Sequence, residues 1–171
     1  MNREWAVANP DRTALWRGLG LPRDDTLLVR SFEGWVHTTD LRRAAGLSER
    51  RLEVRHLRLM SHLARRILPL ALALALALAL ALAVSGREHG GKTARLVLTG
   101  PGGGDGLVPM GTGADSAVRA AGPDVTVTAD VVDWCRLVGD RVTPEALSVR
   151  VDGDEALGLD LVAAAPALAT L

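Results

Sequence analysis

Two side chains between residues 26 and 45 have the types and the spacing that a shared metal ion needs. Glu33 and His37 stand four positions apart, so a helix would carry both on one face, one turn apart. A carboxylate and an imidazole are ordinary zinc ligands, and a catalytic zinc needs three protein ligands plus an open position. The pair therefore predicts part of a divalent-metal site, and its alternative is a surface hydrogen bond.

A second motif, in residues 86–93, has the pattern of a phosphate-binding loop. The segment GREHGGKT matches G-x-x-x-x-G-K-T, in which Lys92 would reach the phosphates and Thr93 would hold magnesium. Such a loop follows a strand and opens a helix, because the helix N-terminus provides part of the anion site. Here an apolar helix is expected before the motif and a strand after it. We therefore expect a loop between domains and no bound nucleotide.

Residues 26–45 must position the metal pair, and their sequence predicts a helix. The segment has no proline, and its apolar residues recur at helical spacing. Asp24 and Asp25 are candidates for the N-cap, and Gly46 is a candidate for the C-cap. The element that carries the pair is therefore expected to be regular over its whole length.

The segments on either side of this helix are expected to differ from each other. Prolines and glycines punctuate residues 1–25, which indicates short helical pieces or loop. A second helix with a strongly basic side is predicted from Ser48 through Leu68. That side lacks interleaved aromatic residues, and twenty Lys and Arg are balanced by twenty Asp and Glu in the whole chain. No nucleic-acid partner is therefore expected.

Residues 67–84 are uniformly apolar. Their sequence, ILPLALALALALALALAV, consists largely of alternating Leu and Ala, and since both residues are good helix formers it predicts a helix. Such a helix would be about 27 Å long, near the hydrocarbon thickness of a bilayer. The segment is expected to be an over-long, partly exposed helix of a cytoplasmic protein, and the alternative is a single-pass membrane protein.

Residues 86–171 differ in composition from the first half. Residues 128–141 predict a helix that is capped by Thr128 or Asp130 and ends near Gly139, and the final residues predict one more strand or helix. The sequence therefore predicts an α+β protein with two domains, residues 1–85 and 86–171, the second built on a small, mostly antiparallel sheet. Strands are predicted where β-branched runs lie between glycines, at residues 94–100, 106–111, 125–129 and 147–154.

Chain size and cysteine content exclude further classes of protein and of metal site. With 171 residues, 48% of them hydrophobic, the chain can bury a core. Its one cysteine, Cys135, excludes an intramolecular disulfide and cysteine-rich zinc sites, which agrees with a reducing, cytoplasmic compartment. Beside Trp134 on an apolar helix face, Cys135 is expected to be a buried hydrophobe rather than a nucleophile. The opening residues lack the pattern of a secretory signal.

Three segments together resemble the mycothiol-dependent maleylpyruvate isomerase family of actinobacteria. They are LLVRSFEGWVHTTDLRRAAGL, SGREHGGKTARLVLTGPGGG and VTVTADVVDWCRLVGDR. The most specific part of the resemblance is the pattern R-x-F-E-x-W-x-H-x-x-D-L-R, which is formed here by Arg30, Phe32, Glu33, Trp35, His37, Asp40, Leu41 and Arg42.

The resemblance implies a fold and a metal centre. Family members join a DinB-like metal-binding helical bundle to a smaller α+β domain likened to sterol-carrier proteins. Glu33 and His37 match two of the family's three metal ligands. The third is a histidine on an earlier helix, and none of His56, His62 and His89 matches it. The chain is therefore expected to be the C-terminal part of such a protein, with a partial bundle whose exposed apolar face favours self-association.

The resemblance also implies a thiol-dependent isomerase or transferase. A divalent metal, zinc, would lower the pKa of the thiol of mycothiol, so that the thiolate adds to a double bond of a small-molecule substrate. Arg136 and Arg141 are candidates for holding the substrate's carboxylates, and solvent-facing arginines are the alternative. With one ligand missing, catalysis is expected to be impaired. The competing expectation is a non-catalytic interaction module, tethered to a membrane through the Leu-Ala helix.

Overall fold

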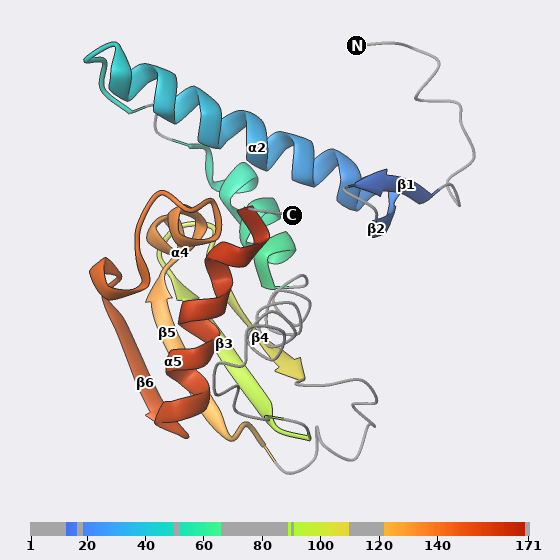
Figure 1. The fold of residues 1–171 in the computed structure, drawn as a ribbon, viewed down its shortest axis with the longest axis vertical. Coiled ribbons are helices and arrows are strands. Elements are labelled where there is room, and N and C mark those ends of the chain that lie inside the picture. Colours follow the sequence, from blue (N-terminus) through green and yellow to red (C-terminus); the bar gives the residue numbers. More distant parts are fainter. Residues whose placement is uncertain are drawn as a thin grey trace, which may run out of the picture. The chain divides into compact units, whose positions relative to one another are not determined.

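The computed structural model describes residues 13–16, 19–49, 52–65, 89, 91–109 and 122–169 (Figure 1). The chain forms two compact units, Met1–Arg50 and Arg51–Leu171. This division lies earlier than the boundary after residue 85 that the change in composition predicts. The basic helix therefore belongs with the sheet of the second unit.

The first unit begins with a hairpin where short helical pieces or loop were expected. Strands β1 (Thr13–Trp16) and β2 (Leu19–Pro22) pair antiparallel. That expectation was wrong for these residues. In the sequence, Gly18 precedes β2 and Pro22 ends it, and each four-residue strand is too short to show a clear alternation.

Helix α2 (Arg23–Ala44) follows the hairpin directly and confirms the predicted helix. It begins three residues earlier than expected, so Asp24 and Asp25 lie in its first turn. There their negative charges interact favourably with the positive end of the helix dipole. Gly46 ends it with φ +66°, as a C-cap glycine does. The apolar side chains that recur along one face and are buried are Val29, Phe32 and Val36.

The second unit contains a four-stranded mixed sheet with the order β4-β3-β5-β6 (Figure 1). Strand β3 pairs antiparallel with β4 and parallel with β5, and β5 pairs antiparallel with β6. Together with the helices, this sheet confirms the α+β class. The strands are β3 (Thr93–Thr99), β4 (Gly104–Pro109), β5 (Val125–Asp130) and β6 (Val149–Gly153).

Helices α4 (Val131–Val138) and α5 (Glu155–Ala164) pack with this sheet. Asp130 caps α4 by accepting the backbone N–H of Val132 at 2.8 Å, so Asp130 is the cap and Thr128 is not. Trp134 of α4 is fully buried. Helix α5 lies so close to β6 that a Cβ added at Gly158 would lie 2.5 Å from a Val151 methyl. Short 3-10 turns follow the two helices: η2 (Pro144–Ala146) comes after α4, and η3 (Ala165–Ala169) comes after α5.

A basic helix occupies residues 54–65 and packs on the glycine-rich turn between β3 and β4. A Cβ at Gly102 would lie 2.7 Å from Leu57 Cβ, so only glycine permits this approach. Ser61 Oγ donates to the Gly102 carbonyl at 2.9 Å. The helix begins six residues after the predicted start at Ser48, whose carbonyl instead accepts Arg42 Nε at 2.7 Å beyond the end of α2.

Residues 67–84, with their Leu-Ala repeat, lie outside the described residues. Among the residues that the structure does describe, no helix is both long enough and apolar enough to span a bilayer.

Candidate functional site

Glu33 and His37 both lie in α2, one turn apart, as the helical spacing predicts. The His37 side chain is exposed and that of Glu33 is 30% exposed. Arg30, one turn before Glu33, donates through Nη1 to Glu33 Oε2 at 3.2 Å. The pair can therefore be reached from outside its helix, and an arriving cation would compete with the Arg30 guanidinium for the carboxylate.

Two ligands are fewer than a zinc site needs. Within the described residues, no cluster of three or more His, Cys, Asp or Glu side chains is arranged to hold a metal ion. His56 and His62 lie exposed on the helix at residues 54–65, in the other compact unit. The residues of α2 thus fit one half of a metal site, with ligand types that suit zinc.

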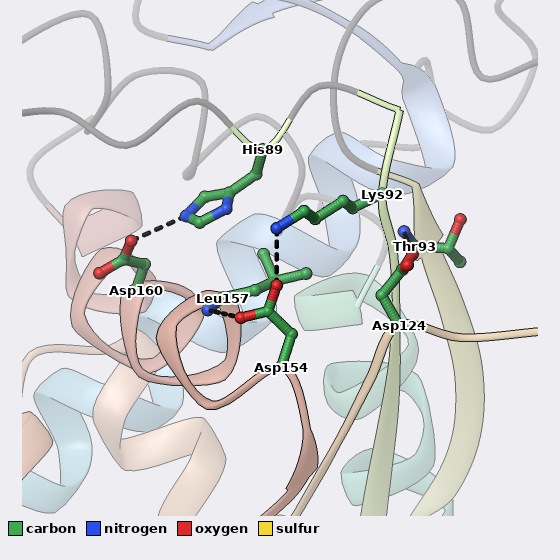
Figure 2. Close-up of polar contacts among 7 residues, drawn as sticks. All are labelled: His89, Lys92, Thr93, Asp124, Asp154, Leu157 and Asp160. Atoms are coloured by element: carbon green, nitrogen blue, oxygen red, sulfur yellow. Dashed lines mark hydrogen bonds and ion pairs between the residues drawn. The ribbon is translucent and has the colours of Figure 1, made fainter.

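The fourth histidine, His89, has a partner of its own. It is 7% exposed, and its Nε2 lies 2.7 Å from Asp160 Oδ2 of α5 (Figure 2). Its Nδ1 is buried and has no hydrogen-bond partner among the residues that the structure describes. His89 is thus engaged within the second unit, in a contact that no sequence pattern predicts.

The phosphate-loop pattern at residues 86–93 ends in a strand, as expected. Thr93 opens β3, and its backbone N–H donates to Asp124 Oδ2 at 2.7 Å. Lys92 Nζ donates to Asp154 Oδ2 at 2.6 Å. Figure 2 shows Lys92 directed at this carboxylate. A phosphate here would meet carboxylates instead of a free helix N-terminus, since Asp154 itself caps α5.

We call the two side-chain contacts His89–Asp160 and Lys92–Asp154 the α5 clasp. The clasp ties the residues before β3 to α5. The Lys92 hydrogen bond, aided by the backbone N–H of Leu157, holds the pKa of Asp154 below its ordinary value. The clasp joins residues more than sixty positions apart. In the sequence, the only signal for the clasp is that charged residues of opposite sign lie near glycines. Such residues are too common in sequences to predict a contact.

Arg136 and Arg141, the candidates for substrate carboxylates, make contacts around α4. Arg136 Nη1 lies 2.9 Å from Asp133 Oδ1, one turn back on the same helix. Arg141 Nη1 donates to the carbonyl of Gly139 at 2.6 Å and more weakly to that of Asp140 at 3.2 Å. Arg141 thus stabilises the end of α4, where a cation also favours the helix dipole. Substrate binding by either arginine stays a prediction.

Cys135 is buried in α4, as expected. Burial, with a smaller contribution from the Asp130 charge, raises the pKa of its thiol to about 12. The thiol is therefore protonated at neutral pH, and a protonated thiol is a poor nucleophile and a poor metal ligand. Thiol chemistry on this chain would need a thiol from another molecule.

The chain matches no family model, no curated protein and no solved structure.

Proposed function

We propose that this chain is a metal-binding protein of the mycothiol-dependent maleylpyruvate isomerase type, and that Glu33 and His37 hold a divalent cation, zinc. The observation that carries the proposal is the position of both side chains on one face of α2, one turn apart and open to solvent on the His37 side. The ligand types support zinc, because a carboxylate oxygen and an imidazole nitrogen are both common in zinc sites.

The chemistry of the proposal is thiol-dependent isomerisation or group transfer. Bound zinc would supply a Lewis acid that lowers the pKa of a thiol into the neutral range. Mycothiol is the proposed thiol, because the only cysteine of the chain is buried with a raised pKa. A small-molecule substrate with carboxylates is the proposed reactant, with Arg136 or Arg141 as its anchor. The proposed compartment is the cytoplasm. Activity is expected to be impaired, because α2 supplies only two ligands.

The second candidate function is a non-catalytic interaction module, tethered to a membrane by residues 67–84. The uniformly apolar sequence of that segment favours it. Such a protein would remain with membranes after a carbonate wash and would bind no metal.

Metal content tests the proposed function. The full chain is dialysed against excess zinc and then against buffer, and zinc per chain is measured by mass spectrometry. We expect the wild-type chain to retain zinc and the variants Glu33→Gln and His37→Ala to lose it. His62→Ala is the matched control, because it removes another exposed histidine from a helix. Equal zinc retention in wild type and both α2 variants would refute the proposed function.

The thiol half of the proposal has its own test. Zinc-loaded chain and mycothiol are mixed with a cis-configured dicarboxylate substrate, and isomerisation is followed by absorbance. We expect slow turnover that needs both zinc and mycothiol and that disappears in His37→Ala. Turnover at the same rate in His37→Ala would contradict a role for the α2 site.

A further inference from the structure

We propose that two copies of this chain associate edge to edge through β6, so that their four-stranded sheets become one continuous sheet across a twofold axis. The interface is the strand β6 (Val149–Gly153), and the partner is a second copy of the chain. Homodimer interfaces are usually isologous, so each copy presents the same strand to the other. The interface uses no residue of α2 and is therefore independent of the proposed function.

Strand β6 lies at one edge of its sheet. In the described part of the chain the sheet has the order β4-β3-β5-β6, so β6 pairs with β5 on one side only (Figure 1). In an antiparallel ladder, the backbone N–H and C=O groups of alternate residues point to opposite sides of a strand. Half of the backbone groups of β6 therefore point away from β5, where a further strand can pair with them.

The two edges of the sheet differ in how well they suit a further strand. Strand β4, at the other edge, contains Gly104 and Gly106 and ends at Pro109, and these residue types disfavour strand pairing. Strand β6 has the sequence VRVDG, in which β-branched valines alternate with charged residues. It lacks the proline and lysine that commonly protect a sheet edge. Strand β6 is therefore the edge that favours pairing.

The charges of β6 select the partner and the register. Arg150 and Asp152 lie two residues apart on one face of the strand, with Val151 between them in the sequence. An antiparallel pairing centred on Val151 sets Arg150 of each copy opposite Asp152 of the other, which gives two cross-strand pairs of opposite charge. Centring on either charged residue would set like charges opposite each other, which is destabilising. Strand β6 is therefore complementary to a second copy of itself.

Arg150 and Asp152 can form these cross-strand pairs at little cost. Within one chain, Arg150 Nε lies 2.9 Å from Asp152 Oδ2, and the two side chains are 77% and 51% exposed. An ion pair as exposed as this one contributes little to stability. Around the twofold axis, each charge gains a second neighbour of opposite sign.

The helix that covers β6 agrees with this arrangement. Helix α5 packs on both β5 and β6, and Gly158 lets it lie close to Val151. A twofold axis perpendicular to the sheet keeps α5 of both copies on the same face. Since strands lie about 4.8 Å apart, the two helices would be about 10 Å apart, which is a normal packing distance for helices. Leu159 of α5, which is 51% exposed, can then become buried against the second helix.

The mass of the full chain in solution tests the association. Sedimentation velocity over a wide range of chain concentration is expected to show a monomer of 18.0 kDa in exchange with a dimer, equally with zinc and with a chelator. Arg150→Asp alone and Asp152→Arg alone each place like charges across the axis, so each is expected to weaken dimerisation by roughly tenfold.

Arg95→Asp is the matched control for these charge changes. Arg95 is an exposed arginine on the same face of the sheet, but it lies in the interior strand β3. This variant is expected to dimerise like the wild-type chain. The β6 interface would be overturned by a wild-type chain that stays monomeric at the highest concentration. It would also be overturned by dimerisation that neither change in β6 weakens more than Arg95→Asp does.

A mixture of the two β6 variants tests the register. The chain with Arg150→Asp can pair with the chain with Asp152→Arg, because opposite charges then face each other at both positions. We expect the mixture to form heterodimers, although each variant alone dimerises weakly. A mixture that associates no better than either variant alone would contradict the pairing centred on Val151. Circular dichroism of each variant checks that the chain is still folded.

Amide hydrogen exchange locates the interface in the wild-type chain. The β6 amides that point away from β5 are expected to exchange more slowly as the chain concentration rises, in step with the fraction of dimer. The amides of β4 are expected to exchange at an unchanged rate. Protection that rises with concentration in another element, with β6 unaffected, would overturn the β6 interface.

Discussion

Asp154 links the clasp to the start of α5 through two hydrogen bonds. It accepts Lys92 Nζ at 2.6 Å and the backbone N–H of Leu157 at 3.1 Å. The Lys92 bond contributes most to lowering its pKa below 3.8, and the Leu157 N–H adds to it. Because the folded pKa lies below the unfolded value, ionised Asp154 stabilises the fold above about pH 4, and this stabilisation is lost as pH falls through the folded pKa.

The prediction for this residue is a pH-dependent difference in melting temperature. Asp154→Asn is expected to melt below the wild-type chain at pH 7, and the difference should shrink as the pH falls below about 4, where the wild-type carboxyl becomes protonated. Thermal unfolding followed by circular dichroism between pH 7 and pH 2 measures it. Glu145→Gln, an exposed carboxylate in η2, is the control. A difference that stays constant over this range would contradict the account.

Burial of Cys135 makes a second residue-scale prediction. With its thiol pKa raised to about 12, the native chain is expected to resist iodoacetamide at about pH 8, because alkylation requires an accessible thiolate. The same chain in concentrated urea should gain one carbamidomethyl group by mass spectrometry. Rapid alkylation of the native chain would show that Cys135 is accessible.

At the residue scale, the sequence predicted the positions that depend on local spacing. Glu33 and His37 share a helix face because α2 is regular, and Cys135 is buried because it lies on the apolar side of α4. The clasp could not be predicted, since His89 and Asp160 meet only after the sheet has formed. The Arg30–Glu33 ion pair depends on the side-chain rotamers of α2, which the residue types leave open.

Among the elements, the basic helix at residues 54–65 makes the sharpest packing contact. Its Leu57 Cβ and the Val54 carbonyl approach Gly102 so closely that a new Cβ would lie 2.7 Å and 2.8 Å from them. Gly102 also has φ +85°, a conformation that L side chains rarely adopt. The turn between β3 and β4 therefore needs glycine for two separate reasons.

A matched pair of substitutions separates those reasons. Gly102→Ala and Gly122→Ala both place alanine at positive φ, and Gly122 has open space around it. In both variants, backbone strain is expected to lower the free energy of unfolding by roughly 1 kcal/mol. In Gly102→Ala, the collision with the basic helix is expected to lower it by about 1–3 kcal/mol more. Urea unfolding monitored by tryptophan fluorescence measures both values. Equal losses would mean that the basic helix moves aside at little cost.

The prediction of helices succeeded where the caps and the apolar spacing lie within the helix's own sequence. Helices α2 and α4 carry caps and apolar spacing within their own sequences, and Asp130 and Gly139 mark the two ends of α4. The hairpin at β1 and β2 was missed because strands of four residues, in a segment punctuated by glycine and proline, resemble loop. The basic helix starts later than Ser48 predicts, and Ser48 instead lies just beyond the end of α2, where its carbonyl accepts Arg42 Nε.

At the scale of the whole molecule, the change in composition and the structural division fall at different places. Composition changes after residue 85, but the compact units divide between Arg50 and Arg51. The reason is the packing of residues 54–65 on the turn at Gly102, a contact between segments that the sequence alone does not bring together. The mixed sheet likewise depends on the parallel pairing of β3 with β5, which is not visible in either strand.

The central claim, that α2 holds a divalent cation through Glu33 and His37, is tested most directly at the histidine side chains. The chain has only four histidines, so labelling their ring nitrogens with nitrogen-15 gives four resolvable imidazoles by NMR. On titration with zinc, the account predicts a saturable shift of the His37 ring nitrogens, with His56, His62 and His89 unchanged, and no such shift of His37 in Glu33→Gln at the same zinc concentration. The account would be contradicted if the His37 ring nitrogens did not shift on titration with zinc while those of His56 or His62 did.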